Sequence, residues 1–394
     1  MKRTILFAAL GALLYTNNAE AVDHTICLRI PVTIGDTTGQ ANDIGTGGNW
    51  KARGIEMRVL NGSTAAQILP WTFANASSGC VSFWSTNNGP FNIQFRPRGR
   101  LAASNELEVR NDSNNLPIYS AGSQTFRSGG THVVVVGSEW ILPRMYAILA
   151  YAIQDGFRGR FDDEKIVVHW NAGAPCGCDD TSCGNCACSS GGVGHIAVCD
   201  WASDNKFLLG HEYGHLNLSL GAGGYTNDCG YGTSSHGMTT LEFDSCAAME
   251  GWAHFVSADI WNGGVHAGGD PVGWFRYWGP VDTINMESGG GSCSSYQRRY
   301  AHECECNADC ATTSTELDWM RMWWDYHTDD SPGDPGSPPS HHQLHSEIKE
   351  GLGWGSTNAC SSIRNGVGAE SGSAQEDRIV QMLWWNGANT TTCN

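Results

Sequence analysis

The sequence predicts an α+β protein in which an all-β, sandwich-like N-terminal domain precedes a larger domain of helices and strands. Three features of the 394-residue chain predict this fold class. Short apolar segments that suit strands alternate with Asn, Gly and Ser clusters up to about residue 137. From residue 140 onward, apolar residues recur at helical spacing. The net charge is +3 over residues 22–160 and −21 over residues 161–394, which indicates two units with different surfaces. We therefore divide the mature chain into residues 22–137 and 138–394.

The first 21 residues have the three parts of a secretory signal peptide. Residues 2–3 form a basic start, residues 5–14 are a short apolar run, and residues 19–21 supply small side chains for a peptidase. The apolar run is too short to span a bilayer, which needs about 20 apolar residues, and no later run is long enough. We expect a secreted, extracellular protein without a membrane span, whose mature chain begins near Val22.

Cysteine usage agrees with export. All 16 cysteines follow the predicted cleavage point, and an even number in an oxidising compartment indicates disulfides. Only Cys27 and Cys80 precede the cysteine cluster of residues 176–188, so they either pair with each other or stay free. Cys360 and Cys393 are expected to tie down the C-terminal tail. The cluster contains a CxxC motif, but in an exported chain we favour disulfides there over a second metal site.

Composition excludes two classes of protein. The chain has 23 basic and 40 acidic residues and a net charge of −17, whereas binding to phosphates needs a basic face, so we expect no nucleic-acid partner. Charged residues make up only 16%, and 16 Trp, 11 Tyr and 12 Phe are present, which excludes a disordered chain. The N-terminal domain contains no catalytic constellation, and its binding partner stays open.

Strands in the N-terminal domain are predicted from apolar segments rich in Val, Ile and aromatic residues. They fall at residues 25–34, 54–60, 80–84, 91–95 and 132–136. Several short strands at such spacing are typical of a β-sandwich, here of about 110 residues.

The second domain is predicted to begin with a helix at residues 140–155, because its apolar residues fall on one face and Pro143 lies in the first turn. Short strands are expected at residues 166–170 and 194–199. A helix follows from about residue 204 to Leu218 and ends in a glycine-rich segment. Later helices are expected at residues 250–261, 316–327, 345–350 and 376–384, with a Pro/Gly-rich loop at residues 331–340.

Residues 211–215 form the motif His-Glu-Tyr-Gly-His, an HExxH pattern, on one of these helices. Residues i and i+4 lie on one helical face, so His211 and His215 can reach the same metal ion. Two neutral imidazoles and a third ligand suit Zn²⁺ and leave one position for water. Glu212 lies beside the pair and is placed to accept a proton from that water.

With the strand at 194–199 before it and Glu-Gly-Trp-Ala-His-Phe at 250–255 after it, the motif resembles the gluzincin group of zinc metallopeptidases. The resemblance covers residues 140–330 as an order of elements and matches in detail only in the two motifs. It implies a zincin-like catalytic domain with Glu250 as third zinc ligand and Glu212 as general base. It also implies a secreted endopeptidase acting on a protein or peptide, with the strand at 194–199 pairing with the substrate backbone.

The chain departs from thermolysin-like members in two places. The segment between His215 and Glu250 is longer and contains Cys229 and Cys246, whose pairing would shorten the effective loop. Those members carry an aspartate four residues after the ligand glutamate, where this chain has His254. By residue type alone, the other candidates for the third ligand are His254, Glu242, Asp244 and His236.

Other classes stay open at this stage. Metzincins carry a glycine and a third histidine where this chain has Leu218 and Gly221, so that class is excluded. A non-catalytic exported binding or adhesion protein with a structural zinc, or a zinc hydrolase of a non-peptide substrate, would fit the same motif. Residues that could donate to an oxyanion are not ranked by the sequence: they are Tyr225, Tyr231, His236 and His327.

Overall fold

The structure is a computed structural model that describes residues 21–32, 48–86, 89–101, 105–126, 128–156, 165–170, 187–190, 194–199, 202–203, 205–222, 238, 242–262, 274–276, 283–285, 313–328, 335–351 and 359–386. The predicted signal peptide before residue 21, most of the cysteine cluster, and the two cysteines Cys229 and Cys393 lie outside these residues. Export, and the pairings expected for Cys229 and Cys393, therefore stay predictions.

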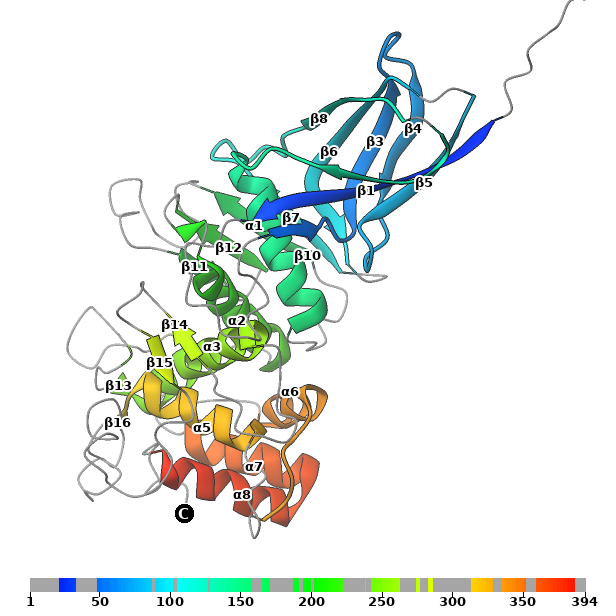
Figure 1. Cartoon of the computed structure of the whole chain (residues 1–394). Helices are drawn as coiled ribbons and strands as arrows, with labels where there is room; N and C mark the ends of the chain where they lie inside the picture. The colour runs from blue at the N-terminus through cyan, green and yellow to red at the C-terminus, as the bar shows by residue number, and fades with distance from the viewer. Residues whose placement is uncertain are drawn as a thin grey trace, which may run out of the picture.

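The N-terminal part of the chain consists of β-sheets, which confirms the prediction (Figure 1). Its strands are β1 (Val22–Val32), β2 (Gly48–Lys51), β3 (Ile55–Asn61), β4 (Gln67–Phe73), β5 (Cys80–Ser85), β6 (Phe91–Arg100), β7 (Glu106–Arg110), β8 (Tyr119–Gln124) and β9 (Gly130–Val135). The sequence did not predict β2, β7 and β8, which are short or polar, or β4, which contains Pro70.

Two sheets share a core in this region. In the smaller sheet, β1 pairs antiparallel with β2 and β5 and parallel with β9. In the larger sheet, β4, β3, β6 and β7 pair antiparallel in that order, and β8 pairs with β6. Alternate side chains are buried along both sheets, including Ile26 and Ile30 on β1 and Ile93 and Phe95 on β6. Because strand side chains alternate between faces, each sheet directs one apolar face into the common core.

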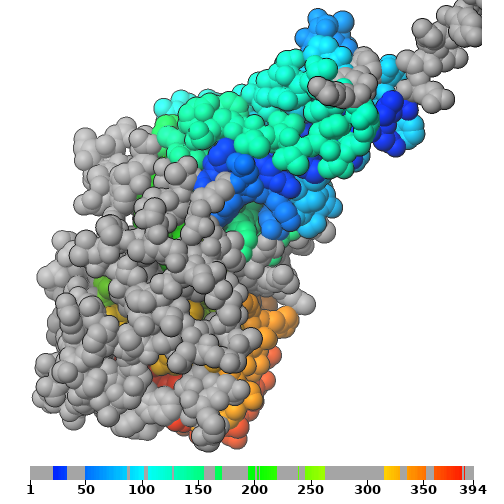
Figure 2. Space-filling model, in the orientation of Figure 1, coloured from blue at the N-terminus to red at the C-terminus, as the bar shows by residue number. Residues whose placement is uncertain are grey.

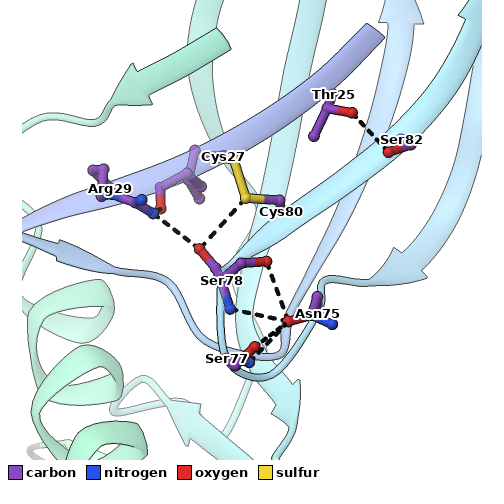
Figure 3. Close-up of a disulfide and its surroundings, with 9 residues drawn as sticks. Thr25, Cys27, Arg29, Asn75, Ser77, Ser78, Cys80 and Ser82 are labelled. Carbon is purple, nitrogen blue, oxygen red and sulfur yellow. Dashed lines mark hydrogen bonds between the residues drawn. A yellow bond between two sulfur atoms is a disulfide. The ribbon is translucent and has the colours of Figure 1, made fainter. Parts of the chain in front are cut away.

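Of the two alternatives left open for Cys27 and Cys80, the structure shows pairing. The disulfide joins β1 to β5, where the two cysteines are also register partners (Figure 3). The turn before Cys80 is held by Asn75, whose Oδ1 accepts from the backbone N–H groups of Ser77 and Ser78 at 3.0 Å each. Cys199, Cys246 and Cys360 are disulfide-bonded as well.

The remainder of the chain is mostly helical, so the fold as a whole is α+β. Its elements are α1 (Ile141–Tyr151), the π-helical turn η1 (Ala152–Gly156), β10 (Lys165–Trp170), β11 (Ala187–Ser190), β12 (His195–Val198), α2 (Lys206–Ala222), β13 (Glu242–Phe243), α3 (Asp244–Asn262), β14 (Trp274–Arg276), β15 (Thr283–Asn285), β16 (Thr313–Ser314), α5 (Glu316–Thr328), α6 (His341–Glu350), α7 (Ala359–Ser371) and α8 (Ser373–Trp385). Figure 2 shows the β-rich part and helices α6 to α8 at opposite ends of the molecule. Among the described helices, none is long and apolar enough to cross a membrane.

The larger sheet continues beyond the boundary predicted at residue 137. Strand β10 pairs parallel with β7 on one side and with β12 on the other, and β11 pairs antiparallel with β12. On α1, Tyr146 donates a hydrogen bond to the carbonyl of Arg53 at 2.6 Å, which fastens the helix to the β-rich part. The division into two domains at residue 137 stays a prediction, and β10 to β12 extend a sheet that begins in the N-terminal part.

This pairing corrects the role expected for the strand at residues 194–199. β12 exists where a strand was predicted, but both of its edges are paired, to β10 and to β11. The strand cannot also pair with a substrate backbone. Among the described strands, the end of this sheet is β11, which packs against α2.

Two helices begin well before their predicted starts, and one helix was not predicted. α3 begins at Asp244, so Glu250 lies within the helix and not at its start. α6 begins at His341, because the Ser340 side chain caps it by accepting from the Gln343 N–H at 3.3 Å. α7 was not predicted at all.

Candidate metal centre

Helices α2 and α3 carry the HExxH motif and Glu250, and they pack closely because of a glycine. A Cβ atom at Gly214 would lie 2.7 Å from Ala253 Cα, so only glycine allows this approach. Nearby, Ser257 on α3 donates a hydrogen bond to the carbonyl of Phe207 on α2 at 2.6 Å. Gly214 therefore permits the close approach of α3 to the motif helix.

The approach of the two helices brings three acceptor-type atoms into a small triangle. His211 Nε2 lies 3.0 Å from His215 Nε2 and 3.2 Å from Glu250 Oε2. His215 Nε2 lies 3.1 Å from the same Glu250 oxygen. All three residues are buried, as is Glu212 between the histidines. Glu250 is thus 35 positions from His215 in the sequence but in contact with it in space.

The other ring nitrogen of His211 faces His254. The two Nδ1 atoms are 3.0 Å apart, and His254 Nε2 lies 2.8 Å from Glu316 Oε2 on α5. A carboxylate only accepts hydrogen bonds, so His254 carries its proton on Nε2 and accepts at Nδ1. His211 then donates from Nδ1–H, which leaves its Nε2 lone pair directed at His215 and Glu250.

Glu316 is held in place by the start of α5. Thr315 and Asp318 form a reciprocal capping pair: Asp318 Oδ2 accepts from the Thr315 N–H at 2.9 Å, and Thr315 Oγ1 accepts from the Asp318 N–H at 3.2 Å. Glu316 is therefore the first helical residue at a well-fixed helix start. Sequence reasoning missed it, although the Thr-x-x-Asp spacing marks the helix start that positions it.

The electrostatics favour neutral histidine and charged glutamate. Burial lowers the pKa of His211 to about 3, with a further contribution from His254 and His215. Burial alone would raise the pKa of Glu250, but the contacts with His215 and His211 outweigh it and hold the pKa well below 4.5. Ionised carboxylate and neutral imidazole are the forms that bind metals.

These residues make up a group that could hold a metal ion. His211, Glu250 and His254 each offer a ligand atom, and these atoms all lie within 4.8 Å of one another. His215 Nε2 adds a fourth donor through the two short contacts given above. Of the other third-ligand candidates, Glu242 and Asp244 lie on β13 and at the start of α3, and His236 lies outside the described residues.

Comparison with known proteins adds no assignment. Neither a protein-family model, nor a curated protein, nor a solved structure matches the chain.

Proposed function

We propose that this chain is a secreted zinc-dependent metalloendopeptidase. The observation that carries the proposal is the triangle of His211 Nε2, His215 Nε2 and Glu250 Oε2, with sides of 3.0–3.2 Å. A tetrahedral zinc ion with ligands at 2.0–2.1 Å has neighbouring ligand atoms about 3.3 Å apart. When both rings are neutral and direct their Nε2 lone pairs into the triangle, the two nitrogens and the carboxylate oxygen repel one another, so a cation among them stabilises the arrangement.

His254 is assigned a positioning role and not that of a ligand. It contacts His211 through Nδ1, whereas the triangle uses His211 Nε2 on the opposite side of the ring. One metal ion cannot bind both nitrogens of one imidazole. A histidine ligand usually donates its second N–H to an acceptor that fixes the ring, and His254 supplies that acceptor here.

Three protein ligands leave a fourth position for water and substrate. A zinc ion held by the three ligands would act as a Lewis acid. It would lower the pKa of a bound water molecule and polarise the carbonyl group of the substrate. Glu212 would take the water proton on its carboxylate and deliver it to the leaving amine, since it follows His211 directly on α2 and is buried with it.

The sheet beside α2 supports a substrate that is an extended chain. Among the described strands β11 ends the sheet, and it packs against α2, so a peptide backbone would pair with its outer edge. A peptide paired with this edge would lie along the metal site. The resemblance to gluzincins had implied this role for the strand at residues 194–199, which is β12.

The proposal is tested with the purified mature chain by zinc content and by cleavage of a denatured protein mixture, with and without a chelator. Glu212→Gln should retain zinc and lose about 10²–10⁴-fold in turnover, because the amide cannot accept the proton. Glu350→Gln, at an exposed position on α6, is the matched control and should behave as the unsubstituted chain.

Two outcomes contradict the proposal. Zinc binding without cleavage of any peptide favours an exported binding protein, and cleavage of esters alone favours a hydrolase of non-peptide substrates. Near-normal peptide cleavage by Glu212→Gln would remove Glu212 from the mechanism.

A further inference from the structure

A second cluster of possible metal ligands lies near the C-terminal end of α3, away from the HExxH motif on α2. Asp259 on α3, His327 on α5 and His341 on α6 each offer a ligand atom, and these atoms all lie within 4.8 Å of one another. Asp259 Oδ2 is 2.7 Å from His341 Nε2, and Asp259 Oδ1 is 3.7 Å from His327 Nε2. The two imidazole rings stack with centroids 4.7 Å apart.

The hydrogen bond on the other side of His327 fixes its proton. His327 Nδ1 lies 2.7 Å from the carbonyl oxygen of Pro339, which can only accept, so Nδ1 carries the hydrogen. In the neutral ring, Nε2 then presents its lone pair toward the Asp259 carboxylate. A backbone carbonyl that holds the distal N–H is a usual partner of a metal-bound histidine.

We propose that Asp259, His327 and His341 bind a second metal ion of the Zn²⁺ type. Two imidazole nitrogens and one carboxylate oxygen suit zinc, whereas calcium and magnesium take oxygen ligands. The separation is 2.7 Å from Asp259 Oδ2 to His341 Nε2 and 3.7 Å from Asp259 Oδ1 to His327 Nε2, and each is within about 0.6 Å of the roughly 3.3 Å between neighbouring ligands of a tetrahedral zinc ion. A small shift of the His341 ring, whose side chain is 25% exposed, would lengthen the shorter separation, and a rotation of the Asp259 carboxylate would shorten the longer one.

This ion is separate from the one proposed at the HExxH motif. Asp259 follows Glu250 by nine positions on α3, which places it about 13 Å farther along the helix axis. Paired metals that share a reaction lie about 3.5–4 Å apart. The second ion therefore does not take part in hydrolysis at the first.

Its role follows from the elements that supply the ligands. The three residues come from α3, α5 and α6, so one ion ties α3 to two helices that come much later in the sequence (Figure 1). α5 also carries Glu316, which contacts His254 at the other centre. An ion at His327 would thus hold the end of α5 opposite to Glu316 and act as a structural clasp.

The experiment counts zinc bound per chain after the full mature protein is loaded with zinc chloride and freed of excess metal. We expect two ions in the unsubstituted chain and one in His341→Gln. His342→Gln, the next residue on α6 and exposed, is the matched control and should keep two. A count that is the same in His341→Gln as in the unsubstituted chain overturns the proposal and indicates a metal-free contact between Asp259 and His341.

A second measurement covers the case in which His341→Gln alters folding. In a His215→Ala background, which weakens the first centre, zinc should raise the melting temperature of the chain as its concentration increases. Addition of Asp259→Asn, a nearly isosteric change, should abolish that rise. The proposal is overturned if the melting temperature still rises with zinc after Asp259→Asn is added. It is also overturned if the melting temperature does not rise with zinc in His215→Ala alone. Both outcomes are independent of whether the chain cleaves peptides.

Discussion

His254 meets His211 at the ring nitrogen that faces away from Glu250, with 3.0 Å between the two Nδ1 atoms. Because His254 also contacts Glu316 at 2.8 Å, a buried series of contacts runs from α5 through α3 to α2. Each contact fixes the proton of the next ring, and the last one directs the His211 Nε2 lone pair into the triangle with His215 and Glu250. A residue on α5 thereby sets the orientation of a proposed ligand on α2.

The first prediction concerns this series. His254→Ala should lower zinc affinity by about 10–100-fold, since His211 loses the acceptor that orients it. Glu316→Leu should lower the affinity in the same direction, because His254 then loses its own acceptor. Affinity is measured by competition with a chelator of known strength.

Glu316→Gln separates orientation from charge. Its amide oxygen still accepts from His254 Nε2–H, so most of the affinity lost in Glu316→Leu should return. An equal loss in Glu316→Leu and Glu316→Gln would contradict the hydrogen-bond argument.

The second prediction concerns Glu250. Glu250→Ala should lower zinc affinity by more than His254→Ala does, that is by more than about 100-fold, because a ligand is lost and not its orienting partner. Circular dichroism of both variants checks that the fold persists. If Glu250→Ala binds zinc with unchanged affinity and His254→Ala loses affinity, His254 and not Glu250 is the third ligand.

The local part of the metal centre could be predicted from the sequence, because it depends on helix geometry. His211 and His215 are four residues apart on one helix, and that spacing alone brings their rings together. Glu250 was reached only through resemblance to a family, since it lies on another helix. Glu316 and the cluster at Asp259 were missed, because no regular spacing connects residues on α3, α5 and α6.

The same distinction holds for the fold. α1 was predicted from helical periodicity, whereas α7 contains Asn365, Gly366 and Gly368, which disfavour helices. α7 forms through tertiary contact: a Cβ at Gly366 would collide with the backbone of Glu347 and of Gly351. A glycine that weakens the helix locally is needed for its packing, and local propensity cannot reveal that need.

The third prediction follows from the contact between α2 and α3. Gly214→Ala should destabilise the protein by about 1–3 kcal/mol and weaken zinc binding, because the added methyl group forces Ala253 and its helix away from α2. Gly368→Ala on α7 is the matched control: its Cβ would meet only the flexible end of Glu376, so it should be neutral or stabilising. Chemical unfolding and zinc titration measure both effects. Unchanged zinc affinity in a folded Gly214→Ala protein would show that the triangle does not depend on this approach.

The fourth prediction concerns Glu108, which links the two parts of the larger sheet. Its carboxylate on β7 contacts Lys165 on β10 at 2.7 Å, Arg110 at 2.6 Å and Arg98 at 3.2 Å. Burial by itself raises the pKa of Glu108, but the hydrogen bonds from Lys165 and Arg110 outweigh it, so the pKa lies below the usual 4.5. A carboxyl with a lowered pKa stabilises the folded state above the unfolded-chain value, and this contribution is lost as the pH falls through the lowered pKa.

Glu108→Gln should therefore lower the free energy of unfolding at pH 7 by on the order of 1–2 kcal/mol, a value discounted because the three cations are partly exposed. The difference between the variant and the unsubstituted chain should narrow as the pH is lowered below 4.5, where Glu108 takes up a proton. Urea unfolding at a series of pH values measures both quantities, and the exposed Glu139→Gln serves as control. If the difference in the free energy of unfolding stays constant below pH 4.5, Glu108 stabilises the pairing of β7 with β10 by packing and not by its charge.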